Sequence, residues 1–169
     1  MELIRPTLDY EKELFVLLQE FNDENISMFW DKDGKAKDDI PTYIKNTQAY
    51  EKWEKFKFFW GKAYTFWLLD DNKLIWMINL REKAEWKYLQ RWGHIWYAIR
   101  KSERGKWYGK KILALVLIEA NAIGLNKVLI TCNRNNIASS KIIEANGGIL
   151  ENVILYKGSH VARYWIDLK

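Results

Sequence analysis

Positive charge and glycine come together just after a predicted strand that spans residues 94–100. The chain turns there through Arg104, Gly105 and Lys106, and a predicted helix starts near Gly109. The first turn of a helix has unpaired N–H groups and a partial positive charge, and glycine lets the backbone approach a ligand closely. The segment therefore predicts a cradle for a pyrophosphate group, although glycine-rich turns also serve as simple connections.

Tryptophan is the unusual feature of the composition, and Trp107 lies inside this turn. The chain has 10 tryptophans, and aromatic residues make up 15% of it. Surplus aromatic side chains can fill a core, line a ligand cleft or build an interface. The composition by itself leaves these three alternatives open.

The remaining composition is that of a soluble globular protein. A length of 169 residues, 49% of them hydrophobic and 29% charged, predicts a single domain over residues 1–169. No apolar run is long enough to span a membrane. One cysteine, Cys132, is expected as a buried strand residue and fits a reducing, cytoplasmic compartment, and with two histidines it predicts no metal site. The net charge of +5 is compatible with an anionic ligand, although a solvated basic surface is the simpler interpretation.

The pattern of apolar residues predicts an α/β fold on a mixed sheet, in the order β-α-α-β-β-β-α-β-α-β-β. The expected strands are 2–5, 64–69, 74–80, 94–100, 128–132, 149–156 and 161–168, and the expected helices are 8–21, 40–57, 109–123 and 137–145. A further short helix is expected around residues 86–89.

The turn and its surroundings resemble a known family. Residues 104–109, which read R-G-K-W-Y-G, resemble the Q/R-x-x-G-x-G/A acetyl-CoA loop of the GNAT superfamily of N-acetyltransferases. Residues 99–103 look like the end of the family's fourth strand, and residues 133–148 look like its N-x-x-S/A segment and the helix that follows. The resemblance extends from about residue 64 onward and includes residues 1–21. It implies a mostly antiparallel GNAT-like sheet flanked by helices.

The resemblance also implies an acyl-CoA site. Backbone N–H groups of the loop and the following helix would hold the pyrophosphate, backbone groups of the fourth strand would hold pantetheine, and an asparagine and a serine would contact the cofactor later in the chain. The loop and helix positions are Arg104, Gly105, Lys106, Tyr108, Gly109 and Lys110. The positions on the fourth strand are Tyr97 and Ile99, and the later contacts are Asn136 and Ser139.

The catalytic groups are less well defined. Many members of the family have a tyrosine acid where this chain has Ile143. The candidates for a base are His94, Glu103 and Glu85, although a lone histidine on a strand is more often a structural hydrogen-bonding group.

Four tryptophans occupy positions where relatives in the family are expected to have glycine, namely Trp76, Trp92, Trp96 and Trp107. An indole in the loop would collide with a diphosphate or force the loop outward. If Trp76 and Trp96 lie on the same face of the sheet, they meet near the acyl-CoA channel. The alternative is that these side chains fill the core.

Two hypotheses follow for function. In the first, the cleft is rebuilt with indoles, as in an engineered binding or assembly scaffold with impaired transferase activity. Such a cleft would take a small aromatic ligand, a protein partner or a second copy of the chain, whereas nucleic acid is not favoured. In the second, the chain is an active acetyl-CoA-dependent N-acetyltransferase that acts on a primary amine.

Overall fold

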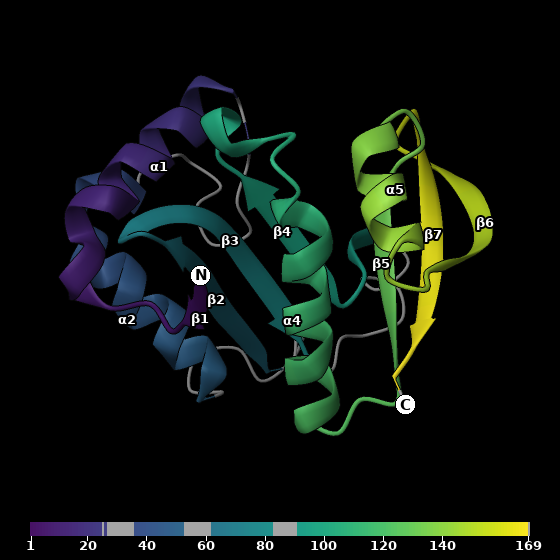
Figure 1. Cartoon of the computed structure of the whole chain (residues 1–169), viewed down its shortest axis with the longest axis horizontal. Helices are drawn as coiled ribbons and strands as arrows, with labels where there is room; N and C mark the ends of the chain where they lie inside the picture. Colours follow the sequence, from purple (N-terminus) through teal and green to yellow (C-terminus); the bar gives the residue numbers. More distant parts are fainter. Residues whose placement is uncertain (25, 27–35, 53–61, 83–90, 169) are drawn as a thin grey trace.

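A central β-sheet organises the computed structural model, which describes residues 1–24, 26, 36–52, 62–82 and 91–168 (Figure 1). Within these residues the sheet has seven strands in the order β1-β2-β3-β4-β5-β7-β6. The strands are β1 (Glu2–Ile4), β2 (Ala63–Asp70), β3 (Lys73–Arg81), β4 (Ile95–Ile99), β5 (Lys127–Asn133), β6 (Ile149–Tyr156) and β7 (Ser159–Asp167). All neighbouring pairs in this sheet are antiparallel except β4 and β5, which are parallel. The predicted mixed, mostly antiparallel sheet is thus confirmed.

Helices cover both faces of the sheet (Figure 1). The helices are α1 (Glu11–Asp23), α2 (Ile40–Glu51), α4 (Tyr108–Ala122) and α5 (Ile137–Glu144), and the short 3₁₀ turns are η1 (Leu8–Tyr10), η2 (Ala36–Asp38) and η3 (Lys101–Glu103). Their order along the chain agrees with the predicted order. The expected helix around residues 86–89 and the expected continuation of α2 beyond residue 52 lie outside the described residues.

Two apolar cores lie on opposite faces of the sheet. One packs α4 and α5 against the strands, with Ile112, Val116 and Ile143 as central members. The other packs α1 and α2 against β2 and β3, with Leu14 and Phe21 among the fully buried side chains. Because both of their faces are covered, β2 and β3 have nearly continuous apolar sequences instead of alternating ones.

Local sequence signals explain where several elements begin. The Asp39 carboxylate accepts a hydrogen bond from the Thr42 N–H and caps α2, and this bond lowers the Asp39 pKa. Asn136 caps α5 in the same way through the Ser139 N–H. Asp71 and Asn72 both have positive φ, as expected for a tight hairpin turn between β2 and β3.

The sheet divides between β4 and β5. Within the described residues these strands pair at one position, Ile95 with Ile130, whereas β3 and β4 pair from Trp76–Ile99 to Leu80–Ile95. Beyond Ile95 the strands diverge, and the edge of β4 that faces β5 has no strand partner among the described residues. No helix in the described part of the chain is long and apolar enough to cross a membrane.

Candidate active site

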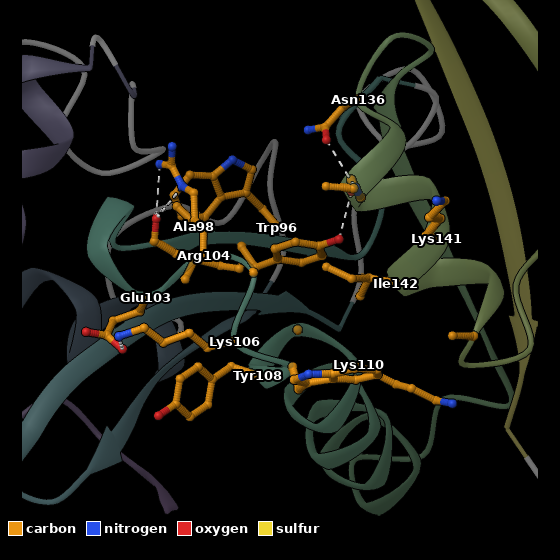
Figure 2. Close-up of a pocket in the computed structure, with 18 of the residues that line it drawn as sticks. Trp96, Ala98, Glu103, Arg104, Lys106, Tyr108, Lys110, Asn136, Lys141 and Ile142 are labelled. Carbon is orange, nitrogen blue, oxygen red and sulfur yellow. Dashed lines mark hydrogen bonds and ion pairs between the residues drawn. The ribbon is translucent and has the colours of Figure 1, made fainter.

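A cavity of about 890 Å³ lies where β4 and β5 diverge, and we call it the main cavity. Its volume is within the range of small-molecule and cofactor sites. In Figure 2, Asn136, the N-cap of α5, and Lys141 of α5 border one side of it, and Trp96, Ala98 and Arg104 border the other. The lining also includes the complete loop of residues 103–110, at the start of α4.

The backbone of β4 offers hydrogen-bonding groups to the main cavity. The N–H of Arg100 bonds to Ile75 O on β3, so strand alternation turns the peptide groups of Ile99 and Tyr97 toward the divergent side. The Arg104 guanidinium donates to Ile99 O from that side, with Nη2 at 3.1 Å. The predicted pantetheine-binding backbone at Tyr97 and Ile99 therefore lies in the cavity wall.

The loop before α4 has the conformation of a phosphate-binding turn. Gly105 has φ +78°, and a Cβ built there would meet no atom within 4 Å, so this glycine is required by the backbone conformation and not by crowding. Tyr108, Gly109 and Lys110 form the first turn of α4, where the N–H groups have no partner within the helix, and all three line the cavity. The helix dipole adds partial positive charge at the same place.

Gly109 also has a packing role. A Cβ at this position would clash with the Ile142 side chain of α5, and it would lie 3.5 Å from Cη2 of Trp76. The close approach of α4 and α5 therefore depends on glycine here, which adds a second reason for the residue besides ligand approach.

The charged residues of the loop are largely paired. Arg104 forms an ion pair with Glu24 at 2.6 Å, and Lys106 forms one with Glu103 at 3.0 Å. Lys110 and Lys141 also line the main cavity, and neither has an ion-pair partner among the described residues. These two lysines are therefore available to an anionic ligand.

Two hydroxyl groups meet at the inner end of the main cavity. The Tyr97 hydroxyl lies 2.7 Å from Ser139 Oγ, so either atom can donate. Burial raises the Tyr97 pKa to about 12, so the phenol keeps its proton at neutral pH. Trp76 packs edge-on against the Tyr97 ring, with 5.1 Å between the ring centroids, and holds the phenol in place. The pair can hold or donate a proton in the cavity.

A second cavity, of about 200 Å³, lies at the point where the two strands begin to separate, and we call it the apex cavity. Trp96, Tyr97, Asn136 and Ser139 line both cavities. The rest of its lining comes from Arg91, Trp92, Ile95, Thr131 and Cys132. The two cavities therefore share the hydroxyl pair as a common wall.

The four tryptophans do not form one cleft. Trp76 pairs with Ile99 and Trp96 pairs with Asn79, so the two indoles lie on opposite faces of the sheet. Trp76 is completely buried in the core beneath α4, and its placement in an altered cleft or interface is wrong. Trp96 and Trp92 do line cavities, since both border the apex cavity.

Trp107 occupies a conformation that usually requires glycine. Its φ is +66°, the left-handed region, and it is the residue immediately before α4. Its side chain is 89% exposed, so the indole extends into solvent at the rim of the main cavity. The backbone at Trp107 thus has the conformation expected of a glycine, and the loop still forms its turn.

The proposed bases have structural partners. His94 Nδ1 accepts a hydrogen bond from the Leu129 N–H at 2.9 Å, and burial lowers the His94 pKa to about 4. The side chain is outside the linings of both cavities. Glu103 lines the main cavity at the loop, where hydrogen bonds from Lys73 and Lys106 lower the pKa of its carboxyl. Glu85 lies outside the described residues.

Other residues of the site escaped the sequence analysis. Ile142 and Lys141 of α5 line the main cavity, Arg91 lines the apex cavity, and Glu24 pairs with the loop. Helical spacing in α5 could have identified Lys141, because it lies on the same side as Ala138. The contact between Glu24 and the loop joins residues 80 positions apart, and no local sequence pattern predicts it.

The comparisons with known proteins agree with this fold. The sequence matches the family described as the acetyltransferase (GNAT) domain over residues 3–149. The chain therefore belongs to the GNAT acetyltransferase family. Among curated protein sequences, no significant match is found.

Several solved structures have a similar fold. The microcin C7 self-immunity acetyltransferase MccE, in complex with acetyl-CoA and AMP, is 19% identical over 98% of this chain and 91% of its own, with a TM-score of 0.74. The ribosomal L7/L12 α-N-protein acetyltransferase RimL, in complex with coenzyme A, is 14% identical over 98% and 93%, also with a TM-score of 0.74. An N-acetyltransferase from Staphylococcus aureus Mu50 is 16% identical over 99% and 98%, with a TM-score of 0.69. At these identities the likeness concerns the fold.

Proposed function

We propose that the protein is an acetyl-CoA-dependent N-acetyltransferase that acts on a primary amine. The observation that carries the proposal is the main cavity, which places around one space a helix N-terminus, the divergent edge of β4, and two lysines that have no ion-pair partner among the described residues. Membership of the GNAT family and a similar fold in MccE, which binds acetyl-CoA, support the same conclusion.

The residues present fit such a cofactor. Backbone N–H groups from Gly105 to Lys110 would bind the diphosphate, and Lys110 and Lys141 would add positive charge. Peptide groups of Tyr97 and Ile99 would hydrogen-bond the pantetheine amides, which requires Arg104 to share or release Ile99 O. Bound acetyl-CoA would supply an activated acetyl thioester.

Two steps of acyl transfer require proton movement, and the site has groups for one of them. Ser139 and Tyr97 hold protons at the wall between the cavities and would protonate the departing thiolate. Among the described residues that line the two cavities, Glu103 is the one carboxylate, and ion pairs with two lysines hold it at the loop. The attacking amine would therefore lose its proton to water.

The alternative of an obstructed scaffold with impaired activity has less support. It depended on indoles filling one cleft, whereas Trp76 is in the core and Trp107 extends into solvent. A cytoplasmic location, expected from the single cysteine, stays a prediction.

A transfer assay tests the proposal. Thiol release from acetyl-CoA in the presence of mixed primary amines should depend on the protein, with the acetylated amine detected by mass spectrometry. Ser139→Ala should lower kcat on the order of tenfold, because the remaining proton donor, the Tyr97 phenol, loses the hydroxyl that positions it. Ser140→Ala is the matched control, since Ser140 Oγ contacts Cys132 Sγ and is absent from both linings. Equal loss in the two variants would contradict the assigned role of Ser139, and no acetylated amine would contradict the proposed function.

A further inference from the structure

The apex cavity has a distinct chemical character. Its lining combines two indoles, those of Trp92 and Trp96, with the guanidinium-bearing residue Arg91 and several hydroxyl or amide groups. Arg91 is the charged residue of this lining, and the described lining contains no carboxylate. Because the hydroxyl pair of Tyr97 and Ser139 forms its shared wall with the main cavity, the apex cavity is next to the expected reaction centre.

Arg91 differs from three other arginines near the sheet. Arg100, Arg104 and Arg163 each form an ion pair with a glutamate at 3.1 Å or less. Arg91 has no ion-pair partner among the residues that the structure describes. Its guanidinium lies over the Trp92 ring, 4.6 Å from the centroid, and 5.6 Å from the centroid of the Tyr156 ring. Aromatic rings hold the guanidinium in position without neutralising it.

The surroundings add further positive charge. Arg81 is buried behind this region and donates to the backbone oxygens of Trp92 and Gly93. Burial lowers the Arg81 pKa to about 10, which still leaves it protonated at neutral pH. Thr131 Oγ1 bonds to Arg91 O and fixes the backbone of the arginine. A polyamine would therefore meet the Arg91 guanidinium here without a carboxylate from the described lining.

We propose that the acceptor amine bears an anionic group, a carboxylate or a phosphate, which Arg91 binds while a flat or apolar part of the molecule packs on Trp92 and Trp96. The inference rests on the proposed acetyl transfer, because it places the acceptor in the apex cavity. A guanidinium binds carboxylate and phosphate through paired hydrogen bonds, and indoles stack with planar groups. Arg91 thus selects the acceptor by its charge.

Matched amines test this selection. Thiol release at saturating acetyl-CoA is measured with phenylalanine against phenylalaninamide, with O-phosphoethanolamine against ethanolamine, and with spermidine. The anionic member of at least one pair should have a kcat/KM on the order of ten- to a hundredfold higher than its neutral partner. The pair that shows the preference identifies carboxylate or phosphate as the recognised group.

Substitution of Arg91 tests whether this residue causes the preference for anionic amines. Arg91→Gln should remove it by raising the KM for the anionic amine at least tenfold more than the KM for its neutral partner, and Arg91→Lys should restore part of it. A merely structural role would lower turnover of both members of a pair alike. Equal kcat/KM within both pairs, a preference for spermidine, or turnover of no anionic amine would overturn the inference.

A binding experiment separates this inference from the proposed function. Calorimetry without acetyl-CoA compares N-acetylphenylalanine with its amide, and N-acetyl-O-phosphoethanolamine with N-acetylethanolamine. Tighter binding of an anionic product, lost in Arg91→Gln, would support the anion site even if no transfer occurred. Failure of acetyl-CoA to bind would instead count against the proposed function.

Discussion

His94 illustrates how the environment of one side chain determines its chemistry. It is 7% exposed, its Nδ1 accepts a backbone hydrogen bond, and its ring lies 6.1 Å from that of Trp165. Burial and the nearby charge of Arg81 both lower its pKa, to about 4. At neutral pH the imidazole is therefore neutral, with its acceptor nitrogen already occupied, and it supports the contact between β4 and β5.

This pKa shift predicts a pH dependence of stability. The unfolded chain takes up the His94 proton near pH 6.5 and the folded chain only near pH 4, so the free energy of unfolding should decrease as the pH falls through this window. His94→Asn keeps an acceptor near the Nδ1 position but cannot titrate. Urea unfolding at a series of pH values should show a shallower decrease for the variant, with kcat retained. An unchanged decrease, or a large loss of kcat, would contradict the structural role of His94.

Trp107 allows a test of backbone strain. A residue other than glycine in the left-handed region is destabilised by roughly 1–2 kcal/mol, and the exposed indole makes few contacts in return. Trp107→Gly should therefore raise the free energy of unfolding by about 1 kcal/mol relative to Trp107→Ala, which removes the indole but keeps the strain. Chemical denaturation of the two variants measures the difference. If the alanine variant is the more stable of the two, the loop does not hold this residue at positive φ.

At the scale of elements, the contact between α4 and β3 depends on which face of the sheet the β3 side chains occupy. The sequence alone does not determine this face. The hairpin turn between β2 and β3 is a local feature, and Asp71 and Asn72 have the positive φ values that such a turn requires. The face of the sheet on which Trp76 lies relative to Trp96 depends on the register between β3 and β4. A shift of one residue would move every side chain of a strand to the opposite face. Residues 83–90, in the connection between these strands, give no pattern that fixes the register. Whether Trp76 and Trp96 share a face was therefore left open by the sequence, and the register between β3 and β4 places them on opposite faces.

The core position of Trp76 predicts a large effect on stability. Trp76→Ala should lower the free energy of unfolding by about 3–5 kcal/mol, as for other buried aromatic truncations. Trp76→Phe should have a much smaller effect, because Nε1 is buried without a hydrogen-bond partner among the described residues and the ring still packs on Tyr97. Thermal or urea unfolding of both variants measures the difference. A near-neutral Trp76→Ala would indicate that the indole lies in a cleft after all.

At the scale of the molecule, the divergence of β4 and β5 creates the site. The left part of Figure 1 holds α1, α2 and β1 to β4, and the right part holds α5 and β5 to β7. The loop motif predicted which residues border the main cavity, because a glycine-rich turn before a helix is a local feature. The apex cavity and the ion pair of Arg104 with Glu24 join distant segments, so their geometry becomes apparent only in the folded chain.

The central claim is that the main cavity binds acetyl-CoA, and calorimetric titration of the purified protein tests it directly. We predict saturable binding of one acetyl-CoA per chain, with a dissociation constant between about 1 μM and 1 mM. Lys110→Gln with Lys141→Gln should weaken binding and reduce its dependence on salt, because both lysines line the cavity and neither has an ion-pair partner in the described part of the chain. The absence of measurable heat at millimolar acetyl-CoA, with the protein shown to be folded, would contradict the claim.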